Sequence, residues 1–231
     1  MIKLVIIDSG GANLGSVCHA LKRLGVDAQV SKDVDTIALA DRLILPGVGA
    51  AGDAMQRLRQ AGLDRLIPQL KQPLLGICLG LQLMYESSAE DKTRCLGIFP
   101  GEVERFQATP QCRVPHMGWN ALQFTEAADP RLSDAICAAE AASQSDSWAY
   151  FVHSFYAPVS EFTWAQCQHG RAFTALARRD NFLAAQFHPE RSAGAGAALL
   201  RYFLNDFQND FSTTKQAGTQ SAALRSAGGS H

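Results

Sequence analysis

The chain has 231 residues, and 47% of them are hydrophobic, which is enough to build a core of domain size. Its 21 lysines and arginines nearly balance its 22 aspartates and glutamates, which argues against a basic surface for nucleic acid or an anionic membrane. Residues 1–8 contain too short an apolar run for a signal peptide, and no later run is long enough to span a bilayer. We therefore expect a cytoplasmic protein.

The six cysteines are scattered, with no C-x-x-C pair and no cysteine and histidine cluster of zinc spacing. They are Cys18, Cys78, Cys95, Cys112, Cys137 and Cys167. This distribution favours reduced thiols and predicts neither a metal site nor a bound cofactor.

In chain order, short apolar runs bounded by turn residues alternate with stretches of helical period. This pattern is typical of an α/β protein whose mainly parallel sheet is flanked by helices. Strands are predicted at residues 2–7, 26–30, 43–45 and 74–77, and helices over residues 17–24 and 51–61. Asn13 can cap the first helix and Gly25 can end it.

In the second half of the chain the helical period fades, and β-type segments dominate from about 97 to 125 and from 148 to 187. A last helix is predicted around residues 197–203. The segment 212–231 is rich in Ser, Thr, Gly, Ala and Gln, and we expect it to be a disordered tail after a single domain at 1–211.

A candidate nucleophile lies in Gly76-Ile77-Cys78-Leu79-Gly80, between a buried strand and an amphipathic run. A nucleophile on a tight turn from strand to helix needs small neighbours, and the glycines supply that room. The start of a helix also favours the thiolate of Cys78. A single cysteine of this kind is nevertheless more often a core residue, so the motif is only suggestive by itself.

A candidate base lies in Gln186-Phe187-His188-Pro189-Glu190. If this segment is extended, His188 and Glu190 project to the same face, because side chains alternate along a strand. The Glu190 carboxylate would then orient the imidazole, which would take the proton of Cys78. A surface turn is the alternative for this match alone, but the two motifs together favour a catalytic pair.

Two glycine-rich loops could bind anionic groups. Pro46-Gly47-Val48-Gly49 follows a predicted strand, and its backbone N–H groups could stabilise an oxyanion. The loop at residues 10–15 lacks the full dinucleotide spacing, so we give nucleotide binding little weight. Structural roles are expected for His19 and His153, which have no acidic neighbour in sequence.

The ordered motifs at 46–49, 76–82 and 186–190 resemble those of the class I, or triad-type, glutamine amidotransferase family. The resemblance implies a flavodoxin-like α/β fold and hydrolysis of L-glutamine to glutamate and ammonia. In that reading Cys78 is the nucleophile, His188 the acid and base, and Glu190 the residue that orients His188. The oxyanion would be stabilised by backbone N–H groups of Gly47, Val48, Gly49 and Leu79.

The same resemblance implies how glutamine is held. Gln82 and Glu90 would bind its amino-acid end, with backbone groups near Ser154 and Phe155. Phe155 stands where tyrosine is common in the family, and Arg191 stands where lysine is usual after His-Pro-Glu. Arg191 keeps the positive charge but presents it as a planar fork.

Two further blocks, Pro115 to Asn120 and Tyr150 to Ser154, resemble the glutaminase subunits of the synthases that make imidazole glycerol phosphate in histidine biosynthesis. The implied partner is a TIM-barrel cyclase subunit, which joins the ammonia to its nucleotide substrate within a heterodimer and also releases AICAR. This chain has no eightfold β/α pattern itself. The residues expected at the interface are Asn13, Pro115, Met117, Trp119, Tyr150 and Arg191. The alternative is that Met117 and Trp119 belong to the core.

Three other functions remain open at this point. The chain could supply ammonia for aminodeoxychorismate, anthranilate, GMP or CTP synthesis, although the block at 115–120 argues against this. It could be a stand-alone cysteine hydrolase, which would need no partner for full activity. It could also be a non-catalytic regulatory subunit, which the intact Cys78, His188 and Glu190 disfavour.

Overall fold

The computed structural model describes residues 2–10, 14–110, 112–140 and 147–207. Asn13, the expected domain boundary at 211 and the expected tail at 212–231 lie outside these residues. In the part of the chain that is described, no helix is long and apolar enough to cross a membrane.

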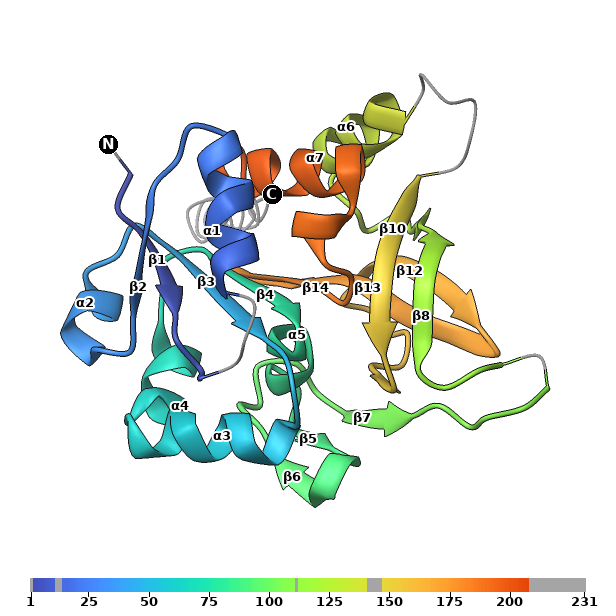
Figure 1. Cartoon of the computed structure of the whole chain (residues 1–231), viewed down its shortest axis with the longest axis horizontal. Coiled ribbons are helices and arrows are strands. Elements are labelled where there is room, and N and C mark those ends of the chain that lie inside the picture. Colours follow the sequence, from blue (N-terminus) through green and yellow to red (C-terminus); the bar gives the residue numbers. More distant parts are fainter. Residues whose placement is uncertain (1, 11–13, 111, 141–146, 208–231) are drawn as a thin grey trace, which may run out of the picture.

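An eight-stranded sheet forms the centre of the molecule, in the order β2-β1-β3-β4-β14-β13-β12-β9 (Figure 1). Its strands are β1 (Leu4–Ile7), β2 (Ala28–Ser31), β3 (Arg42–Gly47), β4 (Leu74–Cys78), β9 (Gln123–Phe124), β12 (Thr163–His169), β13 (Arg171–Arg179) and β14 (Phe182–Ala185). The strands from β2 to β14 run parallel, and the three beyond β14 are antiparallel. This confirms the predicted mainly parallel sheet, and its parallel part has the flavodoxin-like strand order.

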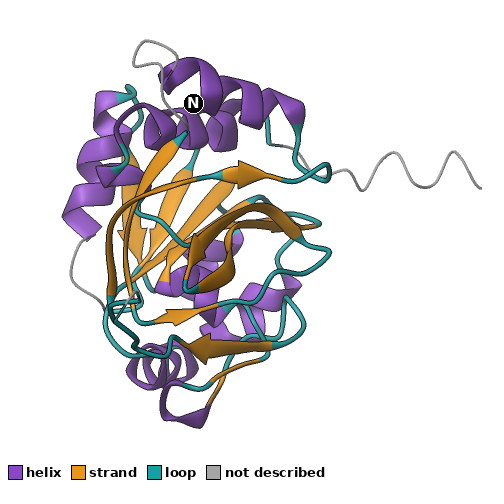
Figure 2. Ribbon diagram, turned by 90° about the vertical axis from the view of Figure 1, so that its right-hand side faces the viewer, coloured by secondary structure: helices purple, strands orange, loops and turns teal. Residues whose placement is uncertain are grey.

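Helices cover both faces of this sheet (Figure 2). One core contains side chains of α1 (Leu14–Arg23), α6 (Pro130–Glu140) and α7 (Ala193–Asn205). The other contains side chains of α2 (Val34–Ala38), α3 (Ala51–Gln60), α4 (Leu63–Leu66) and α5 (Leu79–Leu83). In β1, Leu4 and Ile6 face the first core while Val5 and Ile7 face the second. Burial on both faces explains why the parallel strands are continuous apolar runs.

Two small sheets lie beside the central one. In the first, β8 (His116–Ala121) pairs antiparallel with β10 (Trp148–His153). The second has the order β11 (Phe155–Tyr156), β7 (Glu102–Arg105), β5 (Ser87–Ser88) and β6 (Thr93–Arg94). Short 3-10 turns are η1 (Ile67–Gln69), η2 (Glu90–Lys92) and η4 (Pro189–Arg191). Strand β10 brings the backbone of Val152 to the carboxyl end of β4.

The predicted element positions differ from the observed ones by a few residues. The strand expected at 26–30 is Ala28–Ser31, and the helix around 17–24 ends at Arg23, with Gly25 at φ 77°. Helix α6 had no counterpart in the sequence expectations.

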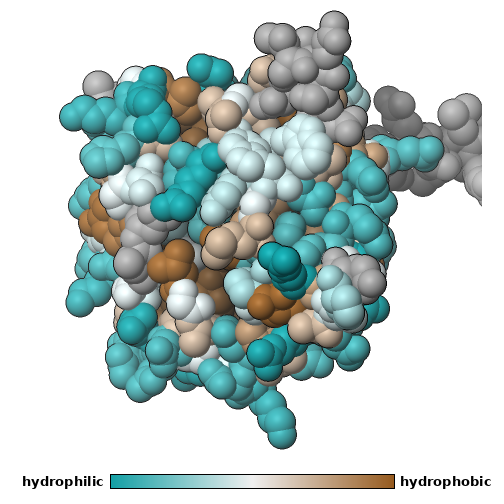
Figure 3. Space-filling model, turned by 45° about the vertical axis from the view of Figure 1, so that its right-hand side comes forward, coloured by the Kyte–Doolittle hydropathy of each residue, from teal (hydrophilic) through white to brown (hydrophobic). Residues whose placement is uncertain are grey.

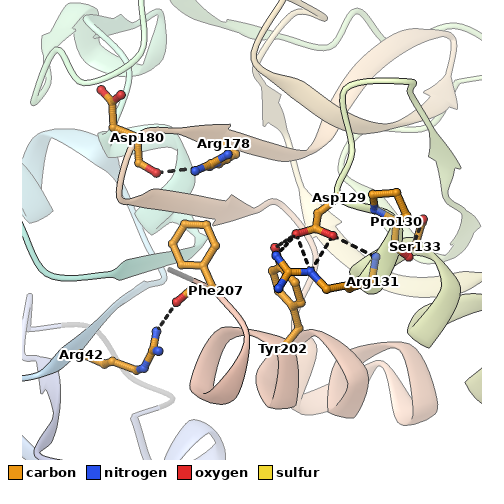
Figure 4. A network of polar contacts seen from close by, with 9 residues as sticks. All are labelled: Arg42, Asp129, Pro130, Arg131, Ser133, Arg178, Asp180, Tyr202 and Phe207. Atoms are coloured by element: carbon orange, nitrogen blue, oxygen red, sulfur yellow. Dashed lines mark hydrogen bonds and ion pairs between the residues drawn. The ribbon is translucent and has the colours of Figure 1, made fainter. Parts of the chain in front are cut away.

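A polar cluster beside α6 ties that helix to α7 (Figure 4). The Asp129 carboxylate accepts hydrogen bonds from the Arg131 guanidinium and from Tyr202 Oη on α7, the latter at 2.7 Å. Close by, Arg42 donates to the carbonyl oxygen of Phe207 at 2.8 Å. The place of α6 is therefore fixed partly by polar contacts with residues far away in the sequence.

Candidate active site

Cys78 stands at the junction between β4 and α5, and its backbone is unusual there. Its φ of 54° and ψ of −107° lie outside the regions that L-residues ordinarily adopt. The side chain is buried, with Sγ 4.0 Å from the carbonyl oxygen of Val152 and 3.8 Å from Nε2 of Gln186. The strained turn from strand to helix presents the sulfur to groups from distant segments, which is the geometry expected of a nucleophile elbow.

Close backbone packing explains the glycines around Cys78. A Cβ on Gly80 would lie 1.8 Å from the carbonyl oxygen of Leu45, and a Cβ on Gly76 would lie 3.0 Å from the Gly80 carbonyl. A Cβ on Gly47 would come 2.9 Å from Cβ of Leu79. Gly47 pairs with Cys78 between β3 and β4, so the glycine-rich strand exit runs directly beside the nucleophile.

His188 and Glu190 are brought together by a turn. Nδ1 of His188 lies 2.9 Å from Oε1 of Glu190, and the two side chains are only 5% and 1% exposed. His188 has an extended backbone, with φ −96° and ψ 99°, but Pro189 begins the 3-10 turn η4. The expectation that strand alternation aligns the two side chains is therefore wrong. The turn folds Glu190 back under the imidazole instead, because proline at its first position presets a helical φ.

The backbone of His188 is also held in place. Its N–H donates to the carbonyl oxygen of Tyr150 at 3.0 Å, and its carbonyl accepts from Ser192 Oγ at 2.7 Å. Ser192 Oγ in turn accepts from the N–H of Tyr150 at 2.9 Å. The imidazole is thus mounted on β10 as well as on its own turn.

The charges around His188 favour its protonated form. Burial by itself lowers the pKa of His188, but hydrogen bonds and charge interactions with Cys78 and Glu190 outweigh burial and raise the pKa. Since Nδ1 is engaged by Glu190, Nε2 is the nitrogen left for the thiol. The arrangement suits transfer of the Cys78 proton to His188 and storage of that proton as an imidazolium.

A cavity of about 610 Å³ opens in front of these residues. Of the residues singled out in the sequence, its lining includes Val48, Gly49, Cys78, Leu79, Gln82, Glu90, Pro115, Ser154, Phe155, His188 and Arg191. The cavity lies at the carboxyl ends of β3 and β4, where open α/β sheets bind their ligands. Gly47 lies beside Cys78, as described above, and Glu190 holds the far nitrogen of His188.

The two polar side chains expected to hold glutamine are both oriented by backbone groups. Gln82 Nε2 donates to the carbonyl oxygen of Phe155 at 2.8 Å. Glu90 Oε2 accepts from the N–H of Ala51, the first residue of α3, at 2.7 Å. Burial raises the pKa of Glu90, and the Ala51 hydrogen bond opposes that rise. The Arg105 guanidinium lies 5.9 Å from the centroid of the Phe155 ring, whereas Gln82 contacts Phe155 through its backbone carbonyl oxygen.

Apart from Asn13, which lies outside the described residues, the residues expected at a partner interface lie in or directly before β8, in β10 and in η4. Met117 is 65% exposed and Trp119 is 49% exposed, so the alternative that they belong to the core is wrong. The Trp119 and Tyr150 ring centroids are 6.0 Å apart, and the Arg191 guanidinium lies 5.9 Å from the Tyr150 centroid. Figure 3, which brings this side of the molecule forward, shows hydrophobic side chains exposed between hydrophilic ones.

Two residues of the site were missed in the sequence analysis. Gln186 is fully buried between Cys78 and Gln82, although it was noted only as part of a motif. His153 lines the cavity, and its hydrogen-bond partners are the Phe155 carbonyl and His116. A search for acidic neighbours could not reveal these contacts, since neither partner is acidic. Among the described residues, no group of three or more histidine, cysteine and acidic side chains could hold a metal ion.

Comparison with known proteins agrees with this geometry. The family model for class-I glutamine amidotransferases matches residues 5–207, so the chain belongs to that family and is an amidotransferase. An imidazole glycerol phosphate synthase subunit HisH from Xanthomonas campestris pv. campestris (strain 8004) is 50% identical over 206 residues, covering 88% of this chain and 98% of that protein. The protein of the same name from Xylella fastidiosa (strain Temecula1) is 48% identical over 204 residues, with the same coverage.

A solved glutamine amidotransferase structure has the same fold. It superimposes with a TM-score of 0.62 at 20% sequence identity and covers 87% of this chain and 96% of its own.

Proposed function

We propose that this chain is the glutaminase subunit of an imidazole glycerol phosphate synthase. The observation that carries the proposal is the meeting of Cys78, His188 and Glu190 at one cavity, in a chain about half identical to curated subunits of that synthase. The substrate is L-glutamine, and the products of this subunit are glutamate and ammonia. All six cysteines are free in the structure, which suits the reducing cytoplasm that we propose as its location.

In the proposed mechanism, His188 takes the proton of Cys78, and the thiolate attacks the side-chain amide carbon of glutamine. The C–N bond then breaks as His188 returns the proton to the departing nitrogen, which leaves as ammonia. A γ-glutamyl thioester remains on Cys78. Water, deprotonated by His188, attacks this thioester and releases glutamate and the thiol. Throughout, Glu190 fixes the tautomer and orientation of the imidazole.

The oxyanion that forms in each half of this reaction needs N–H donors near Cys78. We assign that role to backbone groups of residues 47–49, which run beside Cys78, and of Leu79, the first residue of α5. Helix α5 has only five residues, so its dipole contributes less than individual N–H groups can. Removal of one such donor in other enzymes costs roughly 3–4 kcal/mol of transition-state stabilisation.

The amino-acid end of glutamine is assigned to Gln82, Glu90 and the backbone at Ser154 and Phe155. A carboxylate such as Glu90 suits the α-ammonium group, and backbone N–H groups suit the α-carboxylate. All four residues line the cavity that contains Cys78. Because Phe155 meets Gln82 through its carbonyl oxygen, phenylalanine in place of tyrosine is compatible with this assignment.

The partner in this proposal is a TIM-barrel cyclase subunit, which binds in a heterodimer over Pro115, Met117, Trp119, Tyr150 and Arg191. Exposed aromatic and arginine side chains of this kind dominate binding energy in many interfaces. The Trp119→Ala and Arg191→Ala variants should each weaken cyclase binding at least tenfold in a titration. Leu39→Ala is the control, because Leu39 is an exposed hydrophobic residue at the end of α2, outside the pair formed by β8 and β10. Unchanged affinity in both interface variants would place the partner elsewhere.

A glutaminase assay tests the function as a whole. The chain is assayed with glutamine alone, with the cyclase, and with the cyclase and its nucleotide ligand, while imidazole glycerol phosphate is measured as the final product. The proposal predicts strong stimulation by the loaded partner and ammonia transfer into that product. Full activity without a partner would instead indicate a stand-alone hydrolase. Absence of hydrolysis under all three conditions would indicate a non-catalytic subunit.

A further inference from the structure

A continuous chain of hydrogen bonds runs from β8 to the sulfur of Cys78. Its members are Asn120, His116, His153, Phe155 (through its carbonyl oxygen), Gln82, Gln186 and Cys78. They come from β8, β10, β11, α5, the end of β14 and the end of β4. No two consecutive members of this hydrogen-bond chain are neighbours in the sequence, so the fold brings them together.

At the Asn120 end of the hydrogen-bond chain, the direction of donation is fixed. Asn120 Oδ1 accepts from the N–H of Ala121 at 2.9 Å, and Asn120 Nδ2 donates to the carbonyl oxygen of Gln168 at 2.9 Å. These backbone partners decide which end of the amide is oxygen and which is nitrogen. The Asn120 nitrogen that lies 3.3 Å from His116 Nε2 is therefore a donor.

The histidine tautomers follow from the carbonyl oxygen of Phe155. His153 Nδ1 lies 2.7 Å from that oxygen, which can only accept, so Nδ1 carries the proton. In a neutral ring His153 Nε2 is then an acceptor, and it receives the hydrogen from His116 Nδ1 at 2.9 Å. His116 Nε2 is left to accept from Asn120, in agreement with the first end of the chain.

Burial keeps both rings neutral. Burial lowers the pKa of His153 to about 3 and that of His116 to about 4, with the neighbouring histidines adding to the effect. At neutral pH both rings therefore keep one donor and one acceptor nitrogen. The hydrogen bonds therefore run in one direction from Asn120 to the Phe155 carbonyl oxygen, which accepts from both His153 and Gln82.

The Phe155 carbonyl oxygen also determines how the side-chain amides of Gln82 and Gln186 are oriented. Gln82 Nε2 donates to Phe155 O at 2.8 Å and to Gln186 Oε1 at 3.1 Å, so both of its hydrogens are used. Gln186 must then turn its nitrogen the other way, toward Cys78 Sγ at 3.8 Å. The sulfur thus faces an N–H donor, and the oxygen of Gln82 is the atom left to accept from the α-ammonium group of glutamine.

We propose that Gln186 and His153 are positioning residues of the glutaminase reaction. Gln186 holds the Cys78 sulfur and favours its thiolate, while His153 acts through the Phe155 carbonyl to hold Gln82 for substrate. The inference rests on the proposed function for its catalytic meaning, but the interaction with the sulfur can be measured without turnover. Fully satisfied buried networks are rigid, which is what holding a nucleophile and a substrate ligand requires.

The test for Gln186 follows alkylation of Cys78 by iodoacetamide as a function of pH, in the full chain, with the modified peptide quantified by mass spectrometry. Gln186→Met removes the donor at similar length, and Gln186→Glu keeps an acceptor for Gln82 but replaces the N–H by oxygen. Both changes should shift the midpoint of Cys78 alkylation upward by about one pH unit or more, since a donor to a charged group is lost. Gln72→Met is the matched control, because Gln72 donates to the carbonyl oxygens of Ile37 and Ala38 instead.

Alkylation of Cys167, which is buried, shows whether a variant has unfolded. If one of the two Gln186 variants unfolds, the better folded one is compared with the wild type. An unshifted midpoint in a folded variant would overturn the role of Gln186. Since no glutamine is added, the result holds even if the proposed glutaminase activity fails.

The test for His153 uses glutamine hydrolysis by the complex with the cyclase. His153→Leu removes the donor to Phe155 O, whereas the side-chain amide of asparagine in His153→Asn can replace the Nδ1 donor. His153→Leu should raise KM for glutamine at least tenfold with a smaller change in kcat, and His153→Asn should recover most of the loss. His19→Leu, at an exposed position on α1, is the control. Equal losses in the Leu and Asn variants, or an unchanged KM, would refute the role of His153. Inactive wild-type complex would refute the proposed function instead.

Discussion

The two walls of the cavity are built in different ways. One wall consists of the ends of β3 and β4 with α5, where Gly47, Gly76 and Gly80 allow close backbone contacts around a strained Cys78. The other consists of β10 and β11 backed by β8, where Phe155 pairs with Arg105 of β7 and the Phe106 N–H donates to the carbonyl oxygen of Ser154. The first wall depends on local backbone geometry and the second on long-range pairing.

This difference separates reactivity from positioning. Changes at the elbow should act on the chemical step or on folding itself, because strain and close packing leave no room for adjustment. Changes in the β8 and β10 wall should act on substrate binding, because its polar groups orient the substrate-binding groups of the cavity and do not contact the reacting carbon. Substitutions at Cys78 and Gly80 test the first wall, and the His153 variants test the second.

Loss of the proposed nucleophile should have the largest effect. In the proposed mechanism Cys78→Ala removes the atom that forms the thioester, so glutamine-dependent synthesis by the complex should fall at least about a thousandfold. Ammonia-dependent synthesis should persist, because the proposed partner uses free ammonia. Steady-state assays with glutamine and with ammonium salts measure both quantities. Loss of both activities would assign Cys78 a structural role and remove the basis of the comparison.

Neutralising Glu190 should have the next largest effect on the rate. Glu190→Gln keeps the size of the side chain but allows the wrong His188 tautomer, and a comparable change in a serine protease costs about 10⁴-fold in kcat. We expect a loss of about 10²-fold to 10⁴-fold in kcat with little change in KM. Glu190 helps to raise the pKa of His188, so the variant should also titrate His188 at lower pH, as histidine proton resonances can show. A variant with normal kcat would mean that η4 alone orients the imidazole.

The sequence predicted the first wall better than the second. Cys78, Leu79 and the glycines are neighbours in the chain, and their requirement for small residues is local, so a motif of a few letters reveals it. The parallel strands were equally visible, because burial on both faces leaves uninterrupted apolar runs.

The rest depended on contacts between distant segments. His116 and His153 meet only because β8 and β10 pair in that register, and residues 117 to 152 separate them in the chain. Gln186 is recognised as a site residue only from the partners of its amide oxygen and nitrogen, Gln82 and Cys78, which are distant in sequence. The turn at Pro189 also replaced the expected strand, since proline there begins a 3-10 helix. Helix α6 was missed although its signal is local, since Asp129 precedes a proline at the first helical position and Leu132 and Ile136 lie four residues apart.

The elbow's dependence on close packing can be broken with one methyl group. Gly80→Ala would place Cβ 1.8 Å from the carbonyl oxygen of Leu45, and we expect a loss of about 3 kcal/mol in the free energy of unfolding. Gly15→Ala is the matched control, since a Cβ there meets nothing within 4 Å on helix α1. That substitution should add about 0.5–1 kcal/mol, because alanine favours a helix. Urea unfolding of both variants measures the difference, and equal stabilities would show that the elbow can relax.

The smallest expected effect lies outside both walls, at the Asp129 cluster that joins α6 to α7. Hydrogen bonds from Arg131, with that from Tyr202 adding to them, lower the pKa of Asp129 to about 2 from a value of 3.8, although burial opposes the shift. A carboxyl whose pKa is lowered in the folded state stabilises that state above pH 4, and this contribution is lost as the pH falls from about 4 to about 2. Asp129→Asn should therefore lower the free energy of unfolding by only about 1 kcal/mol at pH 7, because Arg131 is largely exposed. The difference between wild type and variant should shrink over that acidic range in urea titrations, while glutaminase activity at pH 7 stays unchanged. Asp134→Asn, at an exposed position on the same helix, is the matched control. If Asp129→Asn also raised KM for glutamine, α6 would have to be counted with the wall that β8, β10 and β11 form.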